Sequence, residues 1–136
     1  MKKYKMLFLI LILSGFLGGC SVEKIQREKK RQVEFTVVPE MELTEPVKKI
    51  LEERKKAPFR VSFSDQQYTY IIIGYGAQKY AGYRIRVKEL YESDNAIFIK
   101  TEFQGPKGGY EQERETFPYL VVKIEYTDKN VIFSEG

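Results

Sequence analysis

The chain contains no histidine and no tryptophan, and its 136 residues include a single cysteine, Cys20. Without histidine it cannot form a Ser-His-Asp triad or a Cys-His pair, and it cannot build an ordinary zinc site. One cysteine also excludes an intramolecular disulfide. We therefore expect a protein that is not an enzyme and that holds no metal and no cofactor.

A strong charge of one sign is also lacking once the first residues are set aside. The chain has 23 basic and 19 acidic side chains, and three of the lysines but none of the acids lie in residues 1–19. The remaining 20 basic and 19 acidic side chains nearly balance. A nearly balanced charge lacks the excess of basic side chains that nucleic-acid binding requires, so we expect no nucleic-acid partner.

No apolar run is long enough for a membrane-spanning helix, which needs about 18 residues. The longest run at the N-terminus covers residues 6–13, follows three lysines and leads into Ser14-Gly15 and then Gly18-Gly19. A basic start, a short apolar centre and a small-residue exit are typical of a signal peptide. We predict a signal peptide over residues 1–19.

Leu17-Gly18-Gly19-Cys20 resembles the lipobox of bacterial lipoproteins. The resemblance implies a diacylglyceryl thioether on Cys20 and cleavage before it. The alternative is a general secretory signal with a cysteine lying nearby. Because two acyl chains are sufficient for stable anchoring, we expect an extracytoplasmic protein anchored by lipid to the bacterial cell membrane.

Residues 20–32 form a polar segment that we predict to be a tether. Its basic residues are Lys24, Arg27, Lys29, Lys30 and Arg31. Such a segment is either a solvated spacer or a stretch attracted to anionic lipid headgroups, where each basic residue contributes about 1 kcal/mol. The folded domain is then expected to cover residues 33–136.

This domain is predicted to be mainly β, a small antiparallel sandwich or barrel-like fold with one short helix near its N-terminus. The helix is expected over residues 45–56, with Thr44 as its cap and with Val47, Ile50 and Leu51 on one face. Strands are expected at residues 33–38, 59–63, 67–76, 83–91, 96–103, 117–126 and 131–133.

Three details of the strand pattern make further predictions. Residues 71–73 are apolar on both faces, which favours a central, covered strand. Residues 93–95 tolerate turn geometry and predict a hairpin between the strands on either side, with a bulge where Glu89 and Leu90 break the alternation. The last two strands are predicted to pair across residues 127–130.

Two stretches bear on possible ligand sites. Residues 74–82, Gly-Tyr-Gly-Ala-Gln-Lys-Tyr-Ala-Gly, lack the Gly-Lys-Ser/Thr ending of a phosphate loop. Glu111, Glu113 and Glu115 recur at strand spacing beside Arg114. They indicate a solvated loop or edge strand, and the alternative is a weak calcium site.

Several glycine and proline positions carry a resemblance to a known family. Gly76, Gly82 and Tyr83 match one loop of the family pattern, Gly105-Pro106 a second, and Pro118-Tyr119 the closing strand. In these positions the chain, over roughly residues 33–136, resembles the protease complex subunit PrcB family. The resemblance implies a small secreted or lipid-anchored β protein that associates with a surface protease.

The two loops also form a candidate binding end. Where the family has Pro-Thr-Gly, this chain has Lys79-Tyr80-Ala81, so the shape of the first loop differs. We expect residues 77–83 and 105–110 to lie at one end of the fold, or else Gly82 only eases entry into a strand while Tyr83 packs in the core. The expected partner-binding residues are Gln78, Lys79, Tyr80, Gly82, Tyr83, Gly105, Pro106, Gly109 and Tyr110.

The function expected from the sequence is a lipid-anchored, non-catalytic binding module of the cell envelope, associated with an exported protease or another envelope protein. One alternative is a direct peptidase inhibitor, since the Gly-Tyr loop is faintly similar to those of chagasin-like inhibitors. A glycan-binding envelope module is the other alternative, supported only by exposed aromatic residues.

Overall fold

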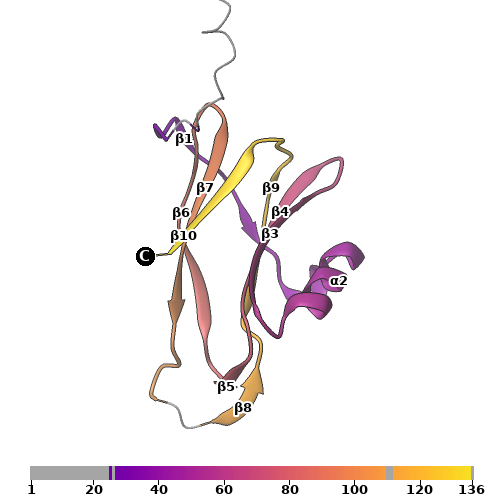
Figure 1. Cartoon of the computed structure of the whole chain (residues 1–136), viewed down its shortest axis with the longest axis vertical. Helices are drawn as coiled ribbons and strands as arrows, with labels where there is room; N and C mark the ends of the chain where they lie inside the picture. Colours follow the sequence, from indigo (N-terminus) through magenta and orange to yellow (C-terminus); the bar gives the residue numbers. More distant parts are fainter. Residues whose placement is uncertain (1–24, 26, 110–111, 136) are drawn as a thin grey trace, which may run out of the picture.

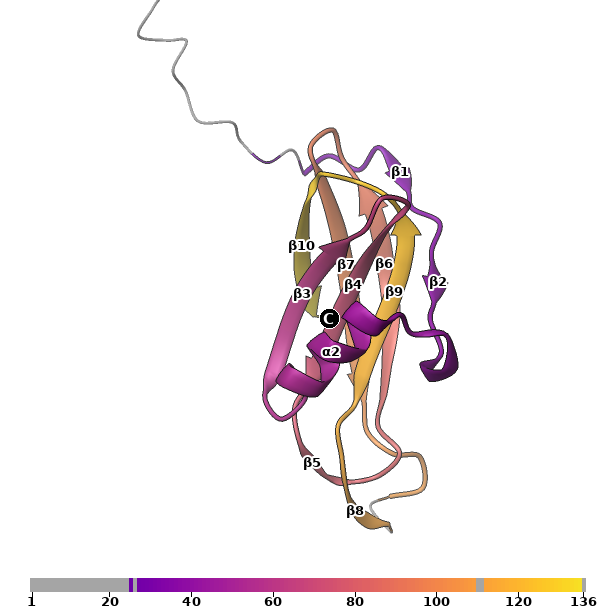
Figure 2. The same ribbon diagram turned by 90° about the vertical axis from the view of Figure 1, so that its right-hand side faces the viewer.

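Two four-stranded sheets face each other in a computed structural model that describes residues 25, 27–109 and 112–135 (Figures 1 and 2). One sheet has the order β1 (Arg31–Gln32), β6 (Arg84–Glu92), β7 (Ala96–Gln104) and β10 (Asn130–Glu135). The other has the order β2 (Thr36–Val37), β9 (Tyr119–Glu125), β4 (Tyr68–Tyr75) and β3 (Pro58–Ser64). The mainly β, sandwich-like prediction is confirmed, and the described strands do not close into a barrel.

The main core lies between the two sheets. Its fully or nearly fully buried members are Ile71, Ile73, Leu120, Val122 and Ile124 from one sheet and Leu90, Ile97 and Ile99 from the other. Strand β4 runs between β9 and β3 and is buried on both faces, as residues 71–73 predicted. Such a strand needs a cover on its second face as well.

Helix α2 (Glu45–Arg54) provides that cover, lying against the outer face of the β4 sheet (Figure 2). It buries Val47 and Leu51 against Tyr70, Ile72 and Val121, after the short 3-10 helix η1 (Glu40–Glu42). The predicted helix is therefore present, and it ends two residues earlier than expected. In the described part of the chain, no helix is long and apolar enough to cross a membrane.

The predicted cap of this helix is wrong. Thr44 stands at the N-cap position, but its hydroxyl makes no capping hydrogen bond. The hydroxyl oxygen is buried and has no hydrogen-bond partner among the described residues. The turn is instead held by the backbone, where the Lys48 amide donates to the Thr44 carbonyl at 3.0 Å.

The predicted single strand over residues 33–38 is also wrong. Only β1 before it and β2 within it are paired, and they belong to different sheets. The Val33 amide donates to Leu90 O at 3.0 Å and the Val38 amide to Val121 O at 2.9 Å. The segment thus crosses from one sheet to the other, which a continuous strand could not do.

The predicted hairpin is confirmed as the antiparallel pair β6 and β7, with its turn at residues 93–95. The register shifts between Val87 and Glu89, one position before the predicted bulge. The extra residue leaves Lys88 and Glu89 exposed and returns Leu90 to the core.

The predicted pairing of the last two strands is wrong. Strand β10 does not return beside β9 but pairs in parallel with β7, with Val131 opposite Ile97. Strand β9 already has β2 and β4 as neighbours, so neither of its edges is free. The connection between β9 and β10 is fixed by Thr69 on β4, whose hydroxyl accepts a hydrogen bond from the Thr127 amide at 3.0 Å.

Candidate partner-binding end of the sandwich

A two-stranded ribbon lies outside both main sheets, at the opposite end of the long axis from the β6–β7 hairpin turn (Figure 1). It consists of β5 (Gln78–Tyr80) and β8 (Glu113–Thr116), joined antiparallel. The Thr116 hydroxyl donates to Tyr80 O at 2.7 Å, and the Ala81 amide donates to Gln112 O at 3.1 Å. We call residues 76–83, 105–109 and 112–116 the distal end.

The two loops expected to share this end meet at Gly82. Its φ is +95°, a conformation that favours glycine. A Cβ atom built on Gly82 would lie 2.8 Å from the Cβ of Pro106. The glycine therefore serves two purposes, since it permits the turn before β6 and lets the second loop pack directly on the first.

An aromatic stack supports the distal end from below. The ring of Phe103 lies between those of Tyr75 and Tyr83, with centroid distances of 4.1 and 5.0 Å. Burial raises the pKa of Tyr75, whose hydroxyl lies 3.5 Å from that of Thr101. Tyr83 is half-buried, so it joins this stack at the rim of the core and not inside it. The stack gives the loops above it a rigid base.

The alternation predicted for β6 continues from this stack along the strand. Ile85 and Val87 are half-buried and pack on the main core, whereas Arg84, Arg86 and Lys88 are exposed. This two-residue period is what a strand covered on one face requires.

The side chains on the ribbon are polar and partly paired. Lys79 Nζ lies 3.5 Å from a carboxylate oxygen of Glu113 and 5.9 Å from the ring centroid of Tyr80. Gln78 turns back and donates through Nε2 to Tyr75 O at 3.1 Å. An open groove runs beside the ribbon and is lined by Ala77, Gln78, Lys79, Glu113, Arg114 and Glu115.

The remaining predicted residues are distributed as follows. Gly108 and Gly109 have positive φ angles of 84° and 96° and face open space, in the same loop as Gly105. Tyr110, Glu111 and the lipidation candidate Cys20 lie outside the described residues.

The possible calcium site is not assembled in the part of the chain that the structure describes. There, no three acidic or thiol side chains gather in a way that could hold a metal ion. Glu113 and Glu115 instead lie exposed on β8.

Sequence reasoning missed two supporting residues. Phe103 is the centre of the aromatic stack, and its position follows only from the register that sets it opposite Ile85. Thr116 closes the ribbon through its hydroxyl, and no local pattern marks it. Both act through pairings between residues distant in the sequence.

One family model matches part of the chain. Residues 69–125 match the family model described as PrcB C-terminal. The matched range begins in β4 and ends with β9, so it contains the β6–β7 hairpin and every residue of the distal end. No curated protein and no solved structure gives a significant match to the chain.

Proposed function

We propose, from the match of residues 69–125 to the PrcB C-terminal family, that the protein is a non-catalytic subunit of a protease complex that binds its protease through the distal end. Lipid on Cys20 holds it at the outer face of the cell membrane. The family supports association with a protease complex, and the lipobox-like Leu17-Gly18-Gly19-Cys20 supports the anchor.

The observation that carries the choice of surface is the meeting of the two loops at Gly82 and Pro106. It gathers a ribbon and a glycine-rich loop on one end of the long axis, above a rigid aromatic base (Figure 1). An isolated two-stranded ribbon is marginally stable in water and contributes little to a core. Its position therefore suits recognition better than stabilisation of the fold.

Tyr80 is the expected anchor of this surface. Tyrosine combines a large contact area with few rotamers and is enriched among interface residues that dominate binding. The side chain is half-buried on β5, beside the Lys79–Glu113 ion pair. Its place on a paired strand limits the entropy lost when a partner binds.

Co-purification from envelope extract tests the proposal. Tyr80→Ala should deplete an exported protease, identified by mass spectrometry, from the captured fraction. Tyr126→Ala is the matched control, since Tyr126 is 54% exposed and lies in the β9–β10 connection, away from the distal end (Figure 1). Truncating an interface anchor costs about 2 kcal/mol or more, a loss of at least about tenfold in affinity. Equal protease recovery with both variants would contradict the proposal.

The same two-loop geometry also fits a direct peptidase inhibitor, because adjacent loops at one end can enter an active-site cleft. The two functions separate in one assay. Adding the purified protein to the captured protease should leave peptide hydrolysis unchanged or extend the lifetime of the protease if the protein is a subunit. A stoichiometric fall in hydrolysis would identify it as an inhibitor.

A further inference from the structure

The basic segment before β1 lies on the folded domain. The Arg27 guanidinium carbon is 5.7 Å from the ring centroid of Phe98, and Lys29 Nζ is 5.1 Å from that of Tyr91. These two rings stack on each other at 4.9 Å. Phe98 points away from the core cluster that contains its neighbours Ile97 and Ile99, yet it is buried. We call residues 27–31 the strap.

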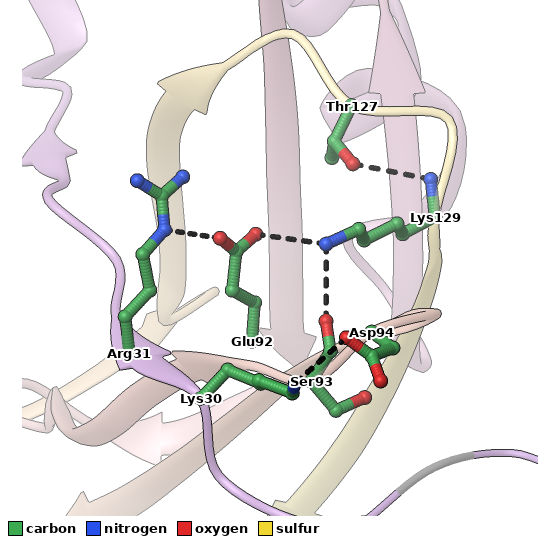
Figure 3. A network of polar contacts seen from close by, with 7 residues as sticks. All are labelled: Lys30, Arg31, Glu92, Ser93, Asp94, Thr127 and Lys129. Carbon is green, nitrogen blue, oxygen red and sulfur yellow. Dashed lines mark hydrogen bonds and ion pairs between the residues drawn. The ribbon is translucent and has the colours of Figure 1, made fainter.

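Ion pairs join the strap to the turn of the β6–β7 hairpin (Figure 3). Arg31 pairs with Glu92, and Lys30 Nζ lies 3.2 Å from Asp94 Oδ1. The Lys30 amide also donates to the backbone carbonyl of Glu92 at 2.9 Å. All these contacts gather at one end of the molecule.

The β9–β10 connection completes this cluster. Lys129 Nζ lies 3.2 Å from the second oxygen of Glu92 and donates to Ser93 O at 3.0 Å (Figure 3). The Glu92 side chain is only 14% exposed, and it is shared between the strap residue Arg31 and Lys129. The strap thus contacts the turn of the β6–β7 hairpin and, through Glu92, the β9–β10 connection. We call this end of the molecule the hairpin end.

We propose that the strap fixes the orientation of the domain on the membrane, with the hairpin end toward the lipid and the distal end away from it. The inference rests on the lipid anchor at Cys20 in the proposed function. Arg27 follows Cys20 by only seven positions, a span that reaches about 25 Å at full extension. The described chain begins at the hairpin end, and the distal end lies at the other end of the longest axis (Figure 1).

A free tether would not fix this orientation. If residues 27–31 were detached, Val33 would be tethered only by the thirteen steps of chain from Cys20, which could span about 45 Å and let the domain turn over. With the strap attached, the distal end faces the space where an exported protease is reached. Exposed ion pairs are screened by salt, so the orientation should weaken as ionic strength rises.

Energy transfer to labelled lipid tests the orientation in the full, lipidated protein. A fluorophore is attached at Asp128→Cys, in the β9–β10 connection, or at Lys107→Cys, in the distal loop. Each protein is reconstituted into phosphatidylcholine vesicles that contain an acceptor-labelled lipid. We expect the higher transfer efficiency from position 128, and loss of the difference at high salt.

Variants then test whether the strap is responsible. Arg27→Gln/Lys29→Gln/Lys30→Gln should abolish the difference and speed hydrogen exchange at the amide of residue 30. Lys48→Gln/Lys49→Gln/Lys56→Gln removes the same charge in and just after α2 and should preserve the difference. Thermal melts establish that each variant is folded.

The outcomes separate the two proposals. Equal transfer from both labels, in vesicle-bound protein with an unsubstituted strap, would contradict the proposed role of the strap. The proposed lipid anchor would not be affected by that result. An unchanged difference in the strap variant would also contradict the role of the strap. Protein that stays unbound to vesicles would overturn the lipid anchor, and with it both the orientation and the membrane part of the proposed function.

Discussion

Gly82 and Gly108 share a left-handed backbone conformation but differ in what surrounds them. A Cβ on Gly82 would contact Pro106 at 2.8 Å, whereas one on Gly108 would meet nothing within 4 Å. At Gly108 the conformation alone opposes a side chain, and at Gly82 a rigid proline ring opposes it as well.

The pair therefore makes a matched test of the loop contact. Gly108→Ala should lower the free energy of unfolding by about 1 kcal/mol, the cost of a left-handed conformation. Gly82→Ala should cost about 2 to 3 kcal/mol, because strain and steric overlap add. Denaturant unfolding of both variants measures the difference. Equal losses of unfolding free energy would show that Pro106 moves aside without a measurable cost.

Tyr83 tests the aromatic base of the distal end. Its ring stacks on Phe103 at a centroid distance of 5.0 Å but is only half-buried. We expect Tyr83→Ala to lower stability by about 1 to 3 kcal/mol, the combined loss of burial and of an aromatic pair. Tyr80→Ala should change the thermal midpoint far less, although it should weaken partner binding. A stable Tyr83→Ala variant would be evidence against the stack as a support.

At the scale of elements, Glu92 connects three parts of the fold: β1, the end of β6 and the β9–β10 connection. Burial raises the pKa of Glu92, but hydrogen bonds and charges from Arg31 and Lys129 outweigh this effect and hold the pKa below its usual value. A carboxylate with a lowered folded-state pKa stabilises the protein above the pKa of the unfolded chain. This contribution is lost as the pH falls through the folded-state pKa.

Glu92→Gln should therefore destabilise the protein by about 1.5 to 3 kcal/mol at neutral pH, the range for a hydrogen bond to a charged group. The difference from the parent protein should shrink as the pH falls below the ordinary Glu pKa and through the lower folded-state pKa, where the Glu92 carboxylate loses its charge. Glu89→Gln is the control, because Glu89 is exposed on the same strand. Urea unfolding at several pH values measures the effect, and a difference independent of pH would exclude the ionised pair as its cause.

At the scale of the whole molecule, the proposed membrane position of the protein depends on one thiol. Cys20 is the sole cysteine and ends the lipobox-like sequence Leu17-Gly18-Gly19-Cys20. Cys20→Ser should move the full chain from the membrane fraction into the soluble extracytoplasmic fraction without unfolding it, since two buried acyl chains are lost. Ser21→Ala keeps the lipobox and should stay with the membranes. Retention of the serine variant after a high-salt wash would contradict the anchor.

The sequence alone determined the elements whose signal is local. Residues 71–73, apolar on both faces, specify a central covered strand wherever the sheet forms. The apolar spacing of Val47 and Leu51 specifies a helix that buries one face, and the turn at residues 93–95 specifies the hairpin. In each case residues a few positions apart decide the outcome, so the pattern could be recognised without partners. The match of residues 69–125 to the PrcB C-terminal family agrees with these elements.

Only the tertiary structure decided how the elements combine. Strand β10 pairs with β7 because both edges of β9 are occupied. Residues 33–38 cross between the two sheets because no single strand pairs with the whole segment. The contact of Gly82 with Pro106 and the sharing of Glu92 between two cations likewise join residues far apart in the chain. Such pairings depend on which edges and charges remain free once the sheets have packed, and no local period in the sequence records that.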